Sequence, residues 1–235
     1  MALLIHVPFN TATAIDATGN YTLSEDSTSP DYQQTAVAPW GGSSCNLRAN
    51  DRLKLDTELV VGDASTVSGG TASSFDMTAM AWVHCIDSDH PSYICGGGSG
   101  GDGMAILRDA TAGDDVVEAR FGGDLIFGRA DAPAEGANHH IAITRLGSSG
   151  AVSIYVDGVE VPEYAYGDLD PTTSEKDWKL LYIGGRTDTA SDFEGRIQDF
   201  RVYDEVLPLS TIKRIKDNSR DAIASHQQLF TPQGF

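Results

Sequence analysis

The stretch NHHIAITRLGSSGAVSIYVDGVEV, residues 138–161, carries the strongest fold signal in this chain. Near its end Asp157-Gly158 stands between β-branched residues, which is the pattern of a hairpin closed by a two-residue type I′ turn. Because side chains alternate along a strand, this register puts four aliphatic residues on one face: Val156, Val159, Ile154 and Val161. Residues 151–161 are therefore predicted to form a β-hairpin.

Two adjacent histidines precede this hairpin, in a segment predicted as a strand over residues 139–145. Successive side chains of a strand point to opposite faces, so His139 shares a face with the isoleucines that follow and His140 lies on the other face. Two side chains that point apart cannot hold one metal ion together. We therefore interpret both histidines as scaffold, one packed at the edge of the core and one facing out.

Strand signals recur along most of the chain, between turns rich in Gly, Asp and Pro. One helix is predicted over residues 207–226, with Ser210 or Thr211 as its N-cap. The pattern predicts an all-β fold, a two-sheet antiparallel jelly-roll β-sandwich with one C-terminal helix, over residues 1–217. The end of the helix and a docking tail are expected at 218–235. The predicted strand segments are 2–9, 47–55, 75–86, 104–109, 116–122, 124–129, 151–161, 179–185 and 192–207, and the apolar helix residues are Ile212, Ile215, Ala222 and Ile223.

The charge of the chain limits its partners. At 235 residues it has a formal net charge of −18 and a pI near 4.4, which disfavours nucleic acids and anionic membranes. The N-terminus MALLIHVPFN lacks the basic region of a signal peptide, and no apolar stretch is long enough to span a membrane. Three cysteines are too few for a disulfide scaffold, and we expect reduced thiols, although Cys85 and Cys95 could face each other across a hairpin.

In order and spacing, four stretches of the chain resemble the laminin G-like, concanavalin A-like jelly-roll superfamily, of the type called the LamG-like or pentraxin-like module. The resemblance covers roughly residues 3–217. One departure is Asn138, where the family usually has tryptophan before the two histidines. The matching stretches are LIHVPFNTATAIDATGN (4–20), SFDMTAMAWVHC (74–85), NHHIAITRLGSSGAVSIYVDGVEV (138–161) and LYIGGRTDTASDFEGRIQDFRVYDEVLPLSTIKRI (181–215).

The resemblance implies a structural calcium ion between the end of the first strand and the last strand. The corresponding residues here are Asp16 and Asp199. Calcium prefers about six to eight oxygen ligands, and carboxylates commonly contribute some of them. The alternative interpretation is that Asp16 makes an Asx turn with Gly19-Asn20, while Asp199 accepts backbone N–H groups.

The family includes glycoside hydrolases, so the resemblance makes an enzyme with paired catalytic carboxylates one possibility. The Glu-x-Asp-x-x-Glu strand motif of the superfamily's β-glucanases is absent, and DDVVE at 114–118 lacks the leading glutamate. Asp114 and Glu118 are predicted to lie on a solvated strand face. The chain also lacks a GxSxG elbow, an HExxH helix and a Walker loop. We therefore expect no enzyme activity.

Aromatic and acidic residues in predicted loops are the candidates for ligand contact. Ordinary loop packing is the alternative for each of them. DSDHPSY contributes Asp87, Asp89, His90 and Tyr93, EYAYGDLD contributes Tyr164, Tyr166, Asp168 and Asp170, and APWGGSS contributes Trp40.

Two functions from different classes fit these observations. The first is a structural or interaction protein of a large assembly, a virus or phage particle component such as a head-decoration or tail-associated protein. It would be made in the host cytoplasm and bind other subunits, or itself, through Leu229, Phe230 and Phe235 of the tail. The alternative is an extracellular calcium-dependent carbohydrate-binding module or lectin-like adhesin. The fold alone does not choose between them.

Overall fold

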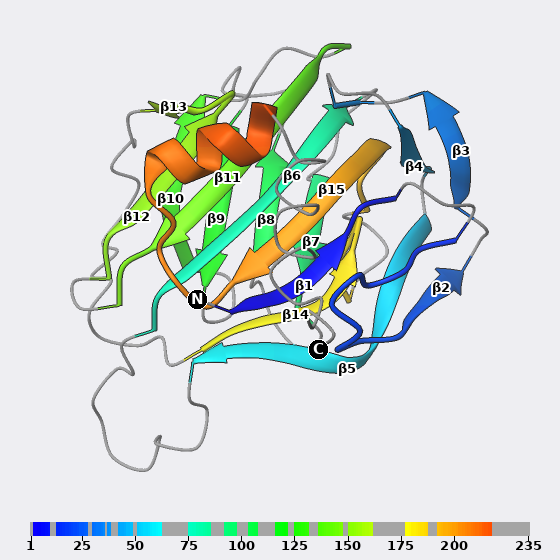
Figure 1. Ribbon diagram of the computed structural model, residues 1–235, viewed down its shortest axis with the longest axis horizontal. Helices are drawn as coiled ribbons and strands as arrows, with labels where there is room; N and C mark the ends of the chain where they lie inside the picture. Colours follow the sequence, from blue (N-terminus) through cyan, green and yellow to red (C-terminus); the bar gives the residue numbers. More distant parts are fainter. Residues whose placement is uncertain are drawn as a thin grey trace, which may run out of the picture.

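Two antiparallel sheets pack face to face in the computed structural model of this chain, and one helix lies against the outside of the first sheet (Figure 1). This confirms the predicted jelly-roll sandwich. No helix among the described residues is both long and apolar enough to cross a membrane. The structure describes residues 2–9, 13–27, 30–35, 37–38, 42–48, 51–62, 75–85, 92–97, 103–107, 116–121, 125–131, 136–147, 150–161, 177–187 and 192–217.

The first sheet, sheet A, has eight strands in the order β13-β12-β11-β6-β15-β4-β3, with β1 also paired to β15. Neighbouring strands are antiparallel. The bounds are Leu3–Val7 for β1, Asp31–Thr35 for β3, Ser43–Leu47 for β4, Met77–Cys85 for β6, Asn138–Arg145 for β11, Val152–Val156 for β12, Val159–Val161 for β13 and Gly195–Tyr203 for β15.

The second sheet, sheet B, has seven strands in the order β10-β9-β8-β7-β14-β5-β2, again antiparallel. The bounds are Leu23–Ser27 for β2, Asp51–Gly62 for β5, Ser92–Gly96 for β7, Gly103–Leu107 for β8, Val116–Phe121 for β9, Leu125–Asp131 for β10 and Asp177–Ile183 for β14.

The main core lies between the inner faces of the two sheets. Alternate residues of each strand supply it, as the period of two along a strand requires. In β6, for example, Met77, Ala79 and Ala81 are fully buried in this core. Trp178 and Phe121 are among the largest side chains opposite, from sheet B.

The hairpin of β12 and β13 has the predicted register. Val156 pairs with Val159, and Ile154 pairs with Val161. Asp157 and Gly158 have φ angles of 53° and 76°, the positive pair that a type I′ turn requires. The predicted turn is therefore confirmed at the level of backbone conformation.

Asp157 also holds both histidines of strand β11. Its Oδ2 lies 2.8 Å from Nδ1 of His139, and its Oδ1 accepts the backbone N–H of His140 at 2.8 Å. The two rings lie on opposite faces of the sheet, as predicted, and His139 is half-buried. His140 does not face solvent, however. It is 1% exposed, because its face of sheet A is covered.

The helix spans residues 209–217 within the described chain and covers part of that outer face of sheet A (Figure 1). The predicted N-cap at Ser210 or Thr211 is wrong, because the carbonyl of Pro208 accepts the N–H groups of Thr211 and Ile212. The helix therefore begins two to three residues earlier than expected. The predicted helix residues beyond 217 lie outside the described ranges. Leu207, Ile212 and Ile215 pack on the outward side chains of sheet A, namely Met80, Ala142, Tyr155 and Tyr203.

The cysteines are placed differently from the predicted hairpin. Cys85 ends β6 in sheet A, whereas Cys95 belongs to β7 in sheet B, so the two strands do not pair as a hairpin. Cys45 and Cys95 are buried free thiols. Nothing is described of the Cys85 side chain.

We expect Asp157→Ala to lower the free energy of unfolding by about 2 kcal/mol. Alanine loses the contacts to both histidine residues, worth roughly 1 kcal/mol, and resists the left-handed backbone at a cost of about 1–2 kcal/mol. Asp157→Asn should cost less, because asparagine tolerates positive φ and can still accept the His140 N–H. Urea unfolding of the two variants measures this order, and equal losses would contradict it.

Candidate functional site

Asp199 lies where the last strand changes partners. One edge of β15 pairs with β4 through residues 195–197 and with β1 through residues 200–203. The register between β15 and β6 also shifts here, between Gln198 and Arg201. Asp199 has a φ angle of 57°, a left-handed conformation that aspartate adopts more readily than most residues. A β-bulge of this kind re-aims side chains at the point where pairing changes.

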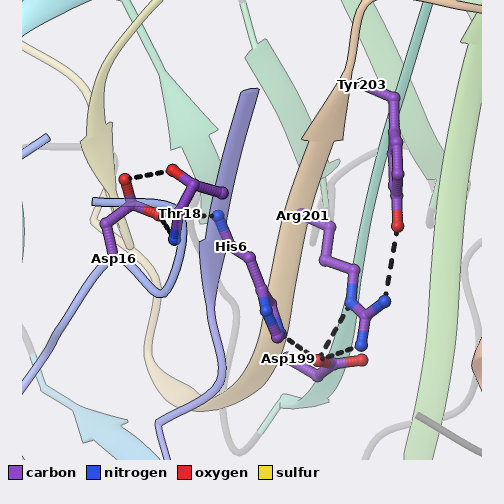
Figure 2. A network of polar contacts seen from close by, with 6 residues as sticks. All are labelled: His6, Asp16, Thr18, Asp199, Arg201 and Tyr203. Carbon is purple, nitrogen blue, oxygen red and sulfur yellow. Dashed lines mark hydrogen bonds and ion pairs between the residues drawn. The ribbon is translucent and has the colours of Figure 1, made fainter. Parts of the chain in front are cut away.

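The bulge directs the Asp199 carboxylate toward the first strand and toward its own strand (Figure 2). Its Oδ1 lies 2.7 Å from Nε2 of His6 and accepts Nε and Nη2 of Arg201 at 3.1 and 3.0 Å. Arg201 also donates to the hydroxyl of Tyr203 at 3.3 Å. His6, Asp199 and Arg201 are all buried. A buried carboxylate is thus paired with a buried guanidinium across the β1–β15 junction.

Asp16 forms a second, separate centre beside β1 (Figure 2). Its Oδ1 accepts the backbone N–H groups of His6 and Thr18, each at 3.0 Å. Its Oδ2 accepts the Thr18 hydroxyl at 2.6 Å and the N–H groups of Asn20 and Tyr21 at 3.0 Å. The carboxylate therefore closes the loop by local hydrogen bonds, as in the Asx-turn alternative.

These two carboxylates do not fit a shared calcium ion. Five N–H or O–H donors surround Asp16, and two cationic or N–H-bearing side chains meet on Oδ1 of Asp199. Calcium requires oxygen ligands at these positions, and N–H groups aimed at the same oxygens oppose it. Within the described ranges there is also no group of three or more side chains suited to a metal. Asp199 has the side chains of His6 and Arg201 as partners, and its acceptance of backbone N–H groups stays a prediction.

Arg201 supplies the positive charge that balances the Asp199 carboxylate at this junction. Burial lowers the pKa of His6, although its hydrogen bond to Asp199 acts in the opposite direction. Burial also opposes the charge on Arg201, but Asp199 and Tyr203 outweigh it and raise the Arg201 pKa. At neutral pH the junction therefore holds a guanidinium–carboxylate pair and a neutral imidazole that donates from Nε2.

We expect Arg201→Met to lower the free energy of unfolding by about 3–5 kcal/mol, because it leaves a buried carboxylate without its cation. The matched control is Arg214→Met on the exposed side of the helix, which should change stability by less than about 0.5 kcal/mol. Urea unfolding measures both variants. Equal stabilities would show that the pair does not hold the junction.

The wild-type protein also tests whether Arg201 or a calcium ion balances the buried carboxylate of Asp199. The wild-type protein should unfold at one Tm in millimolar calcium and in a chelator, since no ligand then stabilises the folded state. A Tm that rises and saturates with calcium would contradict our interpretation of this junction.

His140 lies beside this junction on the outer face of sheet A. Its ring meets Trp82 edge-on, with 5.5 Å between ring centroids, and its Nδ1 is buried without a hydrogen-bond partner. Val37 and Ala38 cover Trp82, and their N–H groups are held by Oε1 of Gln198 at 2.8 and 2.9 Å. Burial lowers the pKa of His140 from 6.5 to about 4.

This shift has a definite consequence for stability. Between pH 6.5 and about 4 the unfolded chain binds a proton at His140 that the folded chain does not, so stability falls as the pH falls through this window. The full effect is about 3 kcal/mol. We expect His140→Phe to remove this part of the pH dependence, as measured by urea unfolding above pH 6.5 and near pH 4. His84→Phe, at a half-buried position of the same sheet, should retain the dependence, and an unchanged slope in His140→Phe would contradict the assignment.

The outer face of sheet B has a different character. Cross-strand partners share a face, and the registers put five residues from five strands in one row across the sheet. The row consists of Lys54, Tyr182, Gly96, Gly103 and Arg120. Its two glycines therefore lie between Tyr182 and Arg120.

Gly96 makes room for Arg186, because a Cβ at Gly96 would lie 2.8 Å from Cβ of Arg186. A Cβ at Gly103 would instead collide with the backbone carbonyl of Cys95 and lie 3.1 Å from Cδ1 of Tyr93. Arg186 therefore crosses the row. Its guanidinium carbon lies 4.8 Å from the centre of the Tyr93 ring, and its Nη1 donates to the Tyr93 hydroxyl at 3.0 Å.

A second guanidinium meets the same ring. The Arg120 guanidinium carbon lies 5.5 Å from the Tyr93 ring centre, and Nε and Nη2 of Arg120 each lie 2.7 Å from Oε2 of Glu118. Glu118 is fully buried, whereas 14% of the Arg120 side chain is exposed. Tyr93 and Glu118 thus form a buried base beneath guanidinium groups that reach the surface.

A third arginine continues the array toward β2. Arg52 stacks over the Tyr182 ring at 4.6 Å and donates from Nε to Asp26 at 2.8 Å. It also donates to the backbone carbonyl of Arg186 and lies 3.6 Å from Oδ1 of Asp192. Planar guanidinium groups held against tyrosine rings are suited to hydroxyl and carboxylate ligands. We call the Tyr93, Arg120, Tyr182, Arg186 and Arg52 set the arginine–tyrosine face.

The sequence identified only one member of this face, and for another reason. Tyr93, predicted as a loop residue exposed to ligand, is instead 1% exposed within β7. The prediction that Glu118 lies on a solvated strand face is wrong, because Arg120 and the rest of the cluster bury it. The other ligand candidates, the tail residues and Asp114 lie outside the described residues: Trp40, Asp87, Asp89, His90, Tyr164, Tyr166, Asp168, Asp170, Leu229, Phe230 and Phe235.

Comparison with known families assigns the fold. The laminin G model described as the concanavalin A-like lectin/glucanases superfamily matches residues 57–213, which is most of the chain. The chain belongs to this superfamily. No curated protein matches it in sequence.

Solved structures with low sequence identity share the fold. Domain 4 of AbnA, a GH43 extracellular arabinanase from Geobacillus stearothermophilus solved with arabinotriose, is 17% identical with a TM-score of 0.60, and the match covers 91% of this chain and 98% of that domain. The receptor-binding domain of botulinum neurotoxin C/D mosaic serotype is 13% identical with a TM-score of 0.57, over 92% of this chain and 51% of that chain. A Trypanosoma rangeli sialidase mutant displaying trans-sialidase activity is 14% identical with a TM-score of 0.56, over 92% and 33% respectively.

Proposed function

We propose that this chain is a non-enzymatic glycan-binding module and that its ligand lies on the arginine–tyrosine face of sheet B. The observation that carries the proposal is the row of planar side chains across that face. Tyr182 neighbours Gly96 in the row, Tyr93 precedes Gly96 on β7, and guanidinium groups cover both rings. Sugars are commonly bound through planar hydrogen-bonding groups, and the partly exposed Arg120 and Arg186 supply such groups at the surface.

The other outer face offers less. On sheet A, helix residues such as Ile212 pack on Met80 and Tyr155, and Val37 and Ala38 pack on Trp82. That face is occupied by the chain itself along much of its length. Sheet B is therefore the better candidate for a ligand surface.

Catalysis has little support on the proposed face. Retaining glycosidases need two carboxylates that reach the scissile bond from either side. Glu118 is the carboxylate beneath the centre of the face, but it is fully buried and held by Arg120. It can position Arg120, and it cannot reach a substrate held at the surface.

Similar structures favour the glycan proposal without deciding it. The arabinanase domain that this chain matches over nearly its whole length was solved with arabinotriose. Cell entry of botulinum neurotoxin type C depends on two ganglioside molecules, and the binding domain of neurotoxin DC was solved with SialylT; the match spans about half of each of these chains. These ligands belong to those proteins, and they support a sugar as the class to test here.

The test is a glycan array of the purified protein, run with and without a chelator and followed by titration of any ligand found. We expect saturable binding in both buffers, because the side chains of the face hold one another in position and need no calcium ion to place them. Tyr182→Leu should weaken binding by about tenfold or more, since it removes the ring that positions Arg52.

The matched control is Tyr155→Leu, on the covered face of sheet A. Tyr155 and Tyr182 are 8% and 7% exposed, so the two variants lose similarly buried rings. Unfolding curves confirm that both remain folded before titration. Absence of binding to every glycan, or an equal loss in both variants, would overturn the proposal.

The role as a virus or phage particle component stays a prediction. Its docking residues Leu229, Phe230 and Phe235 lie outside the described ranges. It does not conflict with glycan binding, because a particle subunit and a lectin-like module can be the same protein.

A further inference from the structure

The arginine–tyrosine face gathers several basic residues, although the chain as a whole is acidic. The formal net charge is −18, with 16 Lys and Arg residues in all. The described basic residues that lie on this face of sheet B are Arg52, Lys54, Lys179, Arg120 and Arg186. Carboxylates lie against two of them, Glu118 at Arg120 and Asp26 and Asp192 at Arg52, so an anion would be recognised by particular guanidinium groups and not by the net charge of the face.

The centre of this face brings two guanidinium groups to one ring. Arg120 and Arg186 lie over Tyr93 at 5.5 and 4.8 Å. Glu118 fixes Arg120 from below, and the Tyr93 hydroxyl fixes Arg186. Both side chains are therefore pre-positioned, which lowers the entropic cost of meeting a ligand. Arg120 and Arg186 are also partly exposed at the surface.

Their chemistry selects an anion. Guanidinium groups bind carboxylates through two parallel N–H donors, and charge-assisted bonds of this kind are about twice as strong as neutral ones. Resting on the proposed glycan-binding function, we propose that the ligand is an acidic glycan, whose sugar carboxylate docks over Arg120 and Arg186 while the sugar ring lies toward Tyr182.

The acidity of the rest of the chain does not prevent this. At physiological ionic strength the Debye length is about 8 Å, so distant carboxylates are largely screened. A ligand on the face responds mainly to the guanidinium groups within reach. Long-range repulsion then affects the association rate more than the final affinity.

The experiment is an array printed in matched pairs, each acidic glycan beside the same glycan with its carboxyl group reduced to an alcohol. The acids include uronic acids and nine-carbon sugar acids, and sulfated glycans form a third set. We expect the acidic member of a pair to bind at least about tenfold more tightly than the reduced member. Its binding should also weaken with added salt, whereas that of the reduced member should not.

Variants locate the charge. Arg186→Gln should remove most of the preference for the acid, and Arg186→Lys should retain the attraction but lose affinity, because lysine lacks the planar pair of donors. Arg214→Gln, on the exposed side of the helix, removes the same charge elsewhere and should leave the preference intact. Equal losses in Arg186→Gln and Arg214→Gln would overturn the inference.

The outcomes also separate the two proposals. Equal binding of acidic and reduced members, or binding of reduced members alone, would overturn the acidic-glycan inference and leave the glycan-binding function standing. Binding confined to the sulfated set would likewise overturn the carboxylate assignment. No binding to any glycan would overturn both.

Discussion

The contact between Asp199 and Arg201 is the constraint on which the arrangement of sheet A depends. At this bulge one edge of β15 passes from β4 to β1, so two strands distant in sequence meet on the same strand. A carboxylate placed here would be costly if it were unpaired. The left-handed backbone of Asp199 turns it toward Arg201 and His6, and the cost is met inside the fold. The first strand is thereby held to the last by a side-chain contact as well as by backbone pairing.

The two outer faces of the sandwich differ in what covers them. On sheet A, the junction, the helix at 209–217 and the Val37–Ala38 pair bury side chains that would otherwise face solvent, including Trp82 and His140. On sheet B, the outward residues are charged and aromatic, and they support one another across strands. The outer face of sheet A is covered by the chain itself, and the outer face of sheet B carries the proposed ligand face.

Local sequence patterns predicted much of the fold and little of the site. Asp157-Gly158 specifies a turn through backbone preferences that act over two residues, so the hairpin register could be derived. Alternation also assigned His139 and His140 to opposite faces, but it could not say that the outer face would be covered. For the same reason Glu118 was expected in solvent. A period of two identifies a face and carries no information about what packs on it.

The site residues could not be found because their contacts are distant in sequence. His6 and Asp199 are 193 positions apart, and Tyr93 and Arg186 are 93 apart. The signal that was available lies in the glycines. Gly96 occupies a strand position where glycine has no intrinsic advantage, which indicates that another group approaches the sheet closely. In the folded protein that group is Arg186, whereas Gly103 has a positive φ angle and faces the backbone carbonyl of Cys95.

The Asp199–Arg201 junction and the arginine–tyrosine face are built from the same kinds of side chain but have different structural roles. Each sets a guanidinium against a tyrosine and near a carboxylate, because the planar group can donate in several directions at once. At the junction the carboxylate belongs to Asp199 and all the groups are buried, so the contact fixes two strands. On sheet B the arginines are held from beneath and reach the surface beside Tyr93. Partly exposed ion pairs of this kind contribute little to stability, and under the proposed function their cations meet the ligand.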